Sequence, residues 1–128
     1  MKNKDIYSNA LSLLAQDITG EENSDFEERA PYIIANFCRE VFELDKLVRS
    51  ILGLTVKKEF TSVQLPLDSE FPLLDRFAAV GATYLAAMLI IDEDSELSDR
   101  LYDIYCDSMA SLQSAIPAVI EKITDRYL

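Results

Sequence analysis

One segment in the second half of the chain is almost wholly apolar, and it limits the fold more than any other feature. Across residues 77–91 (FAAVGATYLAAMLII), only Gly81 and Thr83 lie outside the apolar set. A helix that is apolar on all sides is buried in a protein core or spans a membrane. A span needs roughly 20 such residues, and charged residues flank this segment closely on both sides. We therefore expect the central helix of a buried core and no membrane association.

Amphipathic patterns predict helices on either side of this segment. Apolar residues at helical spacing indicate a short helix from about Lys4 to Gln16. A fourth helix is expected from Asp94 or Ser95 to about Ala115, with one face formed by Leu97, Leu101, Ile104, Ser108 and Leu112. These patterns predict an all-α protein, a small helical bundle of four main helices in a single domain over residues 1–128.

The longest predicted helix carries a heptad seam and ends at Gly53. Its start is open between two positions: the capping box of Ser24 and Glu27 begins a helix near Ser24, whereas the ring of Pro31 favours a start at that proline. Such a seam needs a partner helix, and a seam this short favours partners within the bundle over an intermolecular coiled coil. Its members are Ile34, Phe37, Val41, Leu44, Val48 and Ile51.

Two segments are expected to lie outside the bundle. Residues 54–67 mix β-branched and aromatic residues with charged ones, which favours a projecting loop or a short edge strand. The next helix is expected to start at 68–72, where capping side chains precede a proline. Beyond Pro117, the closing residues 117–128 form either a short helix or an extended tail, and the pattern fits both.

The charge and the missing histidines exclude several function classes. The chain has 12 basic and 23 acidic residues and no histidine, for a net charge of −11. This balance disfavours nucleic-acid binding, which depends on lysine and arginine. Without histidine there is no common general base or metal ligand, so we expect no catalytic residue, no metal site and no cofactor. The acidic residues of 92–103 fail as a calcium loop, since Leu97 stands where glycine is needed.

The acidic residues gather in two stretches, residues 17–28 and residues 92–107, which carry −6 each, whereas the rest of the chain sums to +1. The two cysteines, Cys38 and Cys106, lie in apolar helical patterns, so we expect reduced core residues. No apolar region of a secretory signal follows the first residues, which predicts a cytoplasmic protein.

The order of features resembles a known family of virion proteins. The opening around Ile6, Ala10 and Leu13, with the acidic loop and Ser24-Asp25 after it, resembles the opening of head–tail connector (adaptor) proteins of long-tailed bacteriophages. The second half of the chain is similar to small prophage proteins encoded beside head and neck genes in Gram-positive bacteria, over residues 68–73, 84–87 and 101–105. The resemblance implies a non-catalytic subunit that forms a homo-oligomeric ring on the portal protein, contacts tail-side neck proteins and resides in the virion neck.

Two elements are the candidate interface of such a ring subunit, the loop of 54–67 and the closing tail. An acidic helical regulatory protein that binds a basic partner or mimics the charge of DNA is the alternative function, and an enzyme is the third. The candidate interface residues are Lys57, Lys58, Phe60 and Val63 in the loop, and Val119, Ile120, Ile123 and Tyr127 in the tail.

Overall fold

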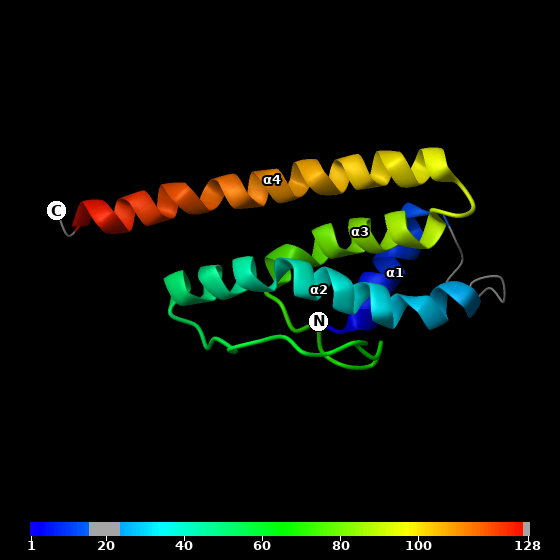
Figure 1. Ribbon diagram of the computed structural model, residues 1–128, viewed down its shortest axis with the longest axis horizontal. Helices are drawn as coiled ribbons and strands as arrows, with labels where there is room; N and C mark the ends of the chain where they lie inside the picture. The colour runs from blue at the N-terminus through cyan, green and yellow to red at the C-terminus, as the bar shows by residue number, and fades with distance from the viewer. Residues whose placement is uncertain (16–23, 127–128) are drawn as a thin grey trace.

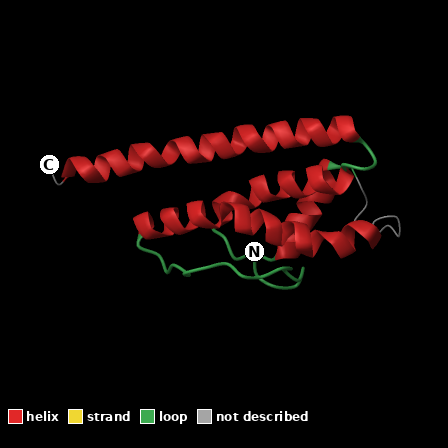
Figure 2. Cartoon of the chain, in the orientation of Figure 1, coloured by secondary structure: helices red, strands yellow, loops and turns green. Residues whose placement is uncertain are grey.

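The protein is an all-α bundle, as predicted. The computed structural model describes residues 1–15 and 24–126, the last eleven of these through their backbone alone. Within these residues there are four α-helices and one short 3-10 helix, and there is no strand (Figures 1 and 2). The elements are α1 (Asn3–Leu13), α2 (Ser24–Leu52), η2 (Asp75–Phe77), α3 (Ala78–Ile90) and α4 (Ser95–Arg126).

Helix α3 is the centre of the bundle, which confirms the expectation for the apolar segment. It packs against α1, α2 and α4, and it separates α4 from the first half of α2 (Figure 1). Five of its small and branched residues are completely buried: Ala82, Leu85, Ala86, Ala87 and Leu89. At 13 residues α3 is short, and in the described part of the chain no helix is both long and apolar enough to cross a membrane.

Helix α2 begins at Ser24, the first of the two predicted starts, and continues through Pro31. A proline inside a helix leaves the carbonyl four residues earlier without its amide donor. That carbonyl belongs to Glu27, which is exposed and can bond water instead. The helix ends before Gly53, whose positive φ of 74° gives the left-handed turn expected there.

The heptad seam of α2 faces the bundle. Ile34, Phe37, Val41 and Val48 are buried, and Leu44 and Ile51 are half-buried against the same core. Phe37 lies so close to α3 that a Cβ on Gly81 would stand 2.7 Å from its ring. Glycine is therefore required at this position by the close approach of the two helices rather than by its backbone angles.

An aromatic cluster joins α2, α3 and α4. The ring of Tyr84 from α3 lies 5.7 Å from that of Phe37 and 5.1 Å from that of Tyr105 on α4. Tyr102 extends the cluster along α4, 5.5 Å from Tyr105. Burial, and secondarily the negative charge of Glu40, raises the pKa of Tyr105 well above its ordinary value.

The predicted helix start at 68–72 is wrong. The chain from 53 to 74 has no regular structure, and helical turns begin only at Asp75. The capping side chain is used elsewhere: the Ser69 hydroxyl donates to the Pro66 carbonyl at 2.7 Å, and the Ser69 carbonyl accepts from the Asn3 amide at 3.0 Å. Contact with the N-terminus thus replaces the helix turn.

Three expectations for α4 also need correction. The helix does not stop near Ala115, because its backbone is helical through Pro117 to Arg126, so the closing segment is helical up to that residue. The turn before Pro117 is exposed, so the carbonyl four residues before the proline, which receives no amide donor from it, can bond water. Ile104 is 53% exposed because the buried face runs through Ser98, Leu101 and Tyr105 instead. Cys106 is exposed beside this face, whereas Cys38 is buried as expected.

The contact of Phe37 with Gly81 predicts that Gly81→Ala destabilises the protein. In an open helix this change stabilises by about 0.5–1 kcal/mol, whereas here the new methyl meets a buried ring, and overpacking costs about 1–3 kcal/mol. We expect the cost of overpacking to exceed the stabilisation, so that Gly81→Ala lowers the free energy of unfolding measured in urea.

A double-mutant cycle provides the control. In a Phe37→Leu background the ring is smaller, so Gly81→Ala should lose most of its cost. If the cost is the same in both backgrounds, the clash is not with Phe37.

Candidate functional site

The irregular segment, residues 53–74, lies along the side of α2 that is remote from α4 (Figure 1). It contains the predicted loop of 54–67 and takes the loop form, since no strand is formed here. An irregular segment must find donors and acceptors for its backbone outside regular structure. The side chains of α2 supply many of them.

Three cations on one face of α2 hold the carbonyls of the irregular segment. Arg39 donates to the Ser62 carbonyl at 2.8 Å, and Lys46 to the Lys58 carbonyl at 3.4 Å. Arg49 donates to the carbonyls of Thr55 at 3.3 Å and Pro72 at 3.2 Å. Residues seven and ten positions apart share one side of a helix, so a single face of α2 fixes the irregular segment at both ends and in the middle.

The buried carboxylate of Asp45 completes this anchor. Asp45 is 2% exposed. Its Oδ2 accepts from Arg49 Nε at 2.9 Å, and its Oδ1 accepts from the Leu74 amide at 2.8 Å. A buried charge is tolerated when it is paired and hydrogen-bonded in this way. Asp45 thereby holds Arg49 in position and fixes the chain just before η2.

The N-terminus holds the other side of the irregular segment. The Phe71 amide donates to the Met1 carbonyl at 2.9 Å, and the Lys4 amide donates to the Leu67 carbonyl at 2.9 Å. The buried Asn3 side chain donates to the Pro66 carbonyl and to the Ser69 hydroxyl, each at 3.0 Å. The irregular segment is therefore tied to two helices.

A groove of ≈ 550 Å³ lies between α2 and the irregular segment. Its apolar lining includes Phe42, Leu65 and Leu73, and the ring of Phe60 lies 6.1 Å from that of Phe42. Charged residues of both signs also line it, Lys46, Arg49 and Lys57 against Asp45, Glu59 and Glu70. The charges balance, so the groove itself selects no ion of either sign.

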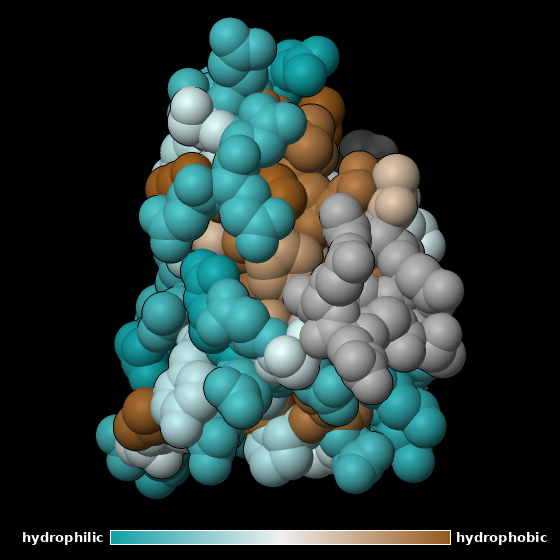
Figure 3. Space-filling model, turned by 90° about the vertical axis from the view of Figure 1, so that its right-hand side faces the viewer, coloured by the Kyte–Doolittle hydropathy of each residue, from teal (hydrophilic) through white to brown (hydrophobic). Residues whose placement is uncertain are grey.

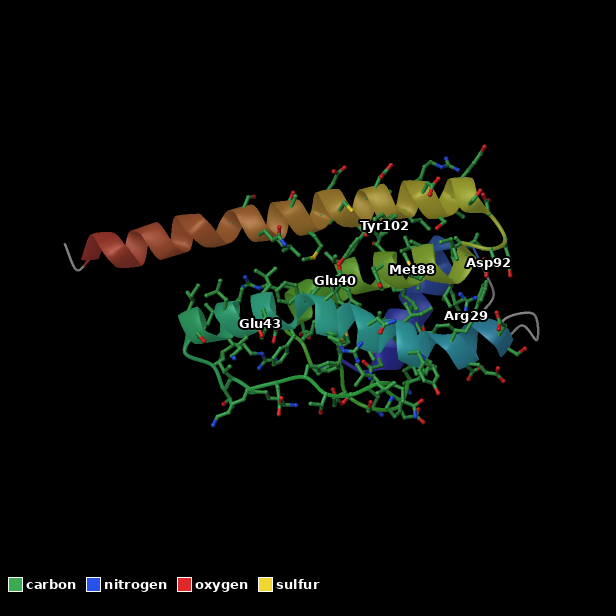
Figure 4. The ribbon with its side chains drawn as sticks, in the orientation of Figure 1. Arg29, Glu40, Glu43, Met88, Asp92 and Tyr102 are labelled. Carbon is green, nitrogen blue, oxygen red and sulfur yellow. The ribbon has the colours of Figure 1, made fainter. Side chains whose placement is uncertain are left out.

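A second, shallower hollow lies between the first half of α2 and α3. Tyr32, Ile33, Tyr84, Met88 and Ile91 form most of its lining. Arg29 closes one side by donating to the carbonyls of Met88 and Leu89, which satisfies the C-terminal end of α3 (Figure 4). Figure 3 shows the end of the molecule where α4 begins, with apolar residues emerging between hydrophilic ones.

The outer face of α4 is acidic. Glu96, Asp99, Asp103 and Asp107 are exposed and follow one another at steps of three and four residues, which places them along one side of the helix. Within the described residues none of the four forms an ion pair, and Arg100 is the single base among them. This face contains part of the second acidic stretch of the sequence.

The structure separates the predicted interface residues into exposed and covered ones. Lys57, Lys58 and Val63 are exposed, Val63 at 68%. Phe60 is half-buried against Phe42, so most of its ring is not free for a partner. Val119, Ile120 and Ile123 lie on the helical backbone of α4 and their side chains lie outside the described residues, as does Tyr127 entirely.

The sequence analysis missed the anchor formed by Arg39, Asp45, Lys46 and Arg49. One signal was available, because the three cations share a side of the predicted helix away from its heptad seam.

Comparisons of the chain with protein families, curated proteins and solved structures find no match. Over the described part of the chain, no group of three histidine, cysteine or acidic side chains is placed to hold a metal ion.

The Asp45 anchor predicts a large effect of Asp45→Asn. The change removes the charge that holds Arg49 and should lower the free energy of unfolding by about 2–3 kcal/mol. This cost is smaller than that of breaking a fully buried ion pair, because Arg49 keeps some contact with water. Asp25→Asn is the matched control, since Asp25 pairs with Arg29 at the same helical spacing on the surface. Its cost should stay below about 1 kcal/mol. Equal costs for the two variants would contradict the anchor.

The two cysteines should differ in reactivity. Burial, and secondarily the charge of Asp45, raises the pKa of the Cys38 thiol to about 12, whereas Cys106 is exposed. Because the thiolate is the reactive form, a thiol reagent at about pH 8 should modify Cys106 in the folded protein and both cysteines only in denaturant. The control is Cys106→Ser, which leaves Cys38 as its remaining cysteine, with the label detected by mass spectrometry. Rapid labelling of this variant in the folded state would show that Cys38 is accessible and would contradict the prediction.

Proposed function

We propose that the protein is a head–tail connector subunit of a long-tailed bacteriophage, which forms a ring between portal and tail and is not a catalyst. The observation that carries this proposal is the length of α4 relative to the bundle. Helix α4 runs antiparallel to α3, its main packing partner, and extends well past the Ala78 end of that helix (Figure 1). A helix that packs along only part of its length is suited to contact a second subunit.

The part of α4 beyond Leu112 is long enough for such a contact. Among the residues of α4 whose side chains the structure describes, Leu112 is the last that packs against the core, and the helix continues to Arg126. At 1.5 Å per residue this continuation spans roughly 20 Å. Its sequence places Ile116, Val119, Ile120 and Ile123 at helical spacing, a pattern typical of a helix that docks on a partner.

The irregular segment supports the same function. It is tied to α2 and to the N-terminus, so it presents Lys57, Lys58 and Val63 to solvent in a defined position. A ring subunit has two different contact surfaces, one for each neighbour. The end of α4 beyond Leu112 and the irregular segment provide two candidates on one core.

The acidic regulator remains the second candidate function, and the unpaired acids on α4 favour it. A regulator of this kind binds a basic protein tightly in a salt-sensitive manner and forms no ring. A connector self-associates or assembles on its portal. The two functions therefore differ in the mass of the purified protein and in its partner.

We expect the purified protein to form rings, either alone at high concentration or on the portal protein of its own genome. Light scattering gives the mass, and negative-stain images show the ring. A chain that ends at Ala115 should keep its folded core, because it retains every described side chain of α4 that packs against the core, down to Leu112, and should assemble more weakly because it lacks the end of α4. Circular dichroism and thermal unfolding of the shortened chain are the control.

A full-length protein that stays monomeric at high concentration and does not bind portal would overturn this function. Assembly that is unchanged in the shortened chain would show that the end of α4, residues 116–126, is not its basis. Binding to an unrelated basic protein without self-association would favour the regulator.

A further inference from the structure

We propose that the lysine edge of the irregular segment, formed by Leu54, Lys57, Lys58 and Val63, docks on the acidic outer face of α4 in a second copy of the chain. This inference deepens the proposed function, on which it rests, by naming one pair of surfaces that meet between subunits, in addition to the end of α4. It is carried by the position, exposure and chemistry of both surfaces.

The lysine edge is an unpartnered surface. Val63 is 68% exposed and Leu54 is 45% exposed, and both lysines are exposed as well. In the described part of the chain, neither Lys57 nor Lys58 forms an ion pair. Glu59 is the single acid of residues 54–67, so the edge keeps a net positive charge in a chain whose total is −11.

The acidic outer face of α4 complements this edge in charge and in apolar character. It presents Glu96, Asp99, Asp103 and Asp107 to solvent with no ion pair among the described residues. Ile104, 53% exposed, is adjacent to Asp103 and one turn from Asp107. Opposite charges flanking exposed aliphatic residues are the features that guide and stabilise a specific contact.

The two surfaces cannot meet within one molecule. The irregular segment lies on one side of the bundle and α4 on the opposite side, with α2 and α3 between them (Figure 1). A contact between them must therefore join two copies. It is also heterologous, because two surfaces on opposite sides of one copy cannot both contact the same second copy, and a two-fold dimer through either surface alone would place like charges together. A repeated heterologous contact closes into a ring or continues as a filament.

The lysine edge is already ordered before it binds. Arg39 and Lys46 of α2 hold the carbonyls of Ser62 and Lys58, and Arg49 holds that of Thr55. An ordered segment loses less conformational entropy on association than a free loop. The anchor of the irregular segment thus favours binding without taking part in it.

Charge reversal tests the pairing with the full-length protein. Lys57→Glu with Lys58→Glu, and separately Asp103→Lys with Asp107→Lys, should each weaken self-association by about ten-fold or more, because like charges then face one another. Self-association should return in the variant with all four changes and in an equimolar mixture of the two double variants. Sedimentation velocity measures the assembly, and raised salt should weaken the wild-type contact.

Glu27→Lys with Glu28→Lys is the matched control, because it alters the net charge as much as the α4 reversal does, at an exposed site on α2. It should leave assembly unchanged, and circular dichroism checks the fold of every variant. If the wild type assembles but neither reversal weakens it, or recovery fails, this pairing is wrong and the connector function stands. If the wild type forms no oligomer alone or on portal, the pairing and the connector function both fail.

Discussion

The structure depends on the burial of α3, a helix without a polar side. Such a helix is stable in water only when other elements cover it, and each fully buried leucine or isoleucine contributes about 1.5–3 kcal/mol. Helices α1, α2 and α4 all pack against it. Where Gly81 meets Phe37, the approach of α2 leaves no room for a side chain. The arrangement of the other helices follows from this requirement.

The irregular segment is ordered by a different interaction, the polar anchor on α2. Its backbone carbonyls accept from Arg39, Lys46 and Arg49, and Asp45 holds both Arg49 and the Leu74 amide. The same helix therefore presents an apolar side to α3 and a polar side to the irregular segment. The anchor engages Arg39, Lys46 and Arg49, whereas Lys57 and Lys58 of the segment are exposed and form no ion pair among the described residues.

These two interactions place the acids of α4 and the lysine edge on opposite sides of the molecule. The acids of α4 point away from the core because its buried face is needed by α3, and the lysine edge lies beyond α2 on the other side. The net charge of −11 hides this difference. For a subunit that assembles head to tail, polarity of this kind distinguishes the two contact surfaces and disfavours contacts between like surfaces.

Local patterns in the sequence determined the helical class, the central apolar helix and the end of α2 at Gly53, because periodicity and backbone preferences act over a few residues. They failed at Pro117, where α4 continues because an exposed turn tolerates the proline, and they failed where distant groups compete. Ser69 turns toward Asn3 instead of starting a helix, and Ile104 faces solvent because packing on α3 sets the rotation of α4. Of the candidate interface, the lysines and Val63 could be named from composition. Their position opposite the acidic face of α4 was decided only by the tertiary structure, since packing around α3 places segments that are far apart in the chain.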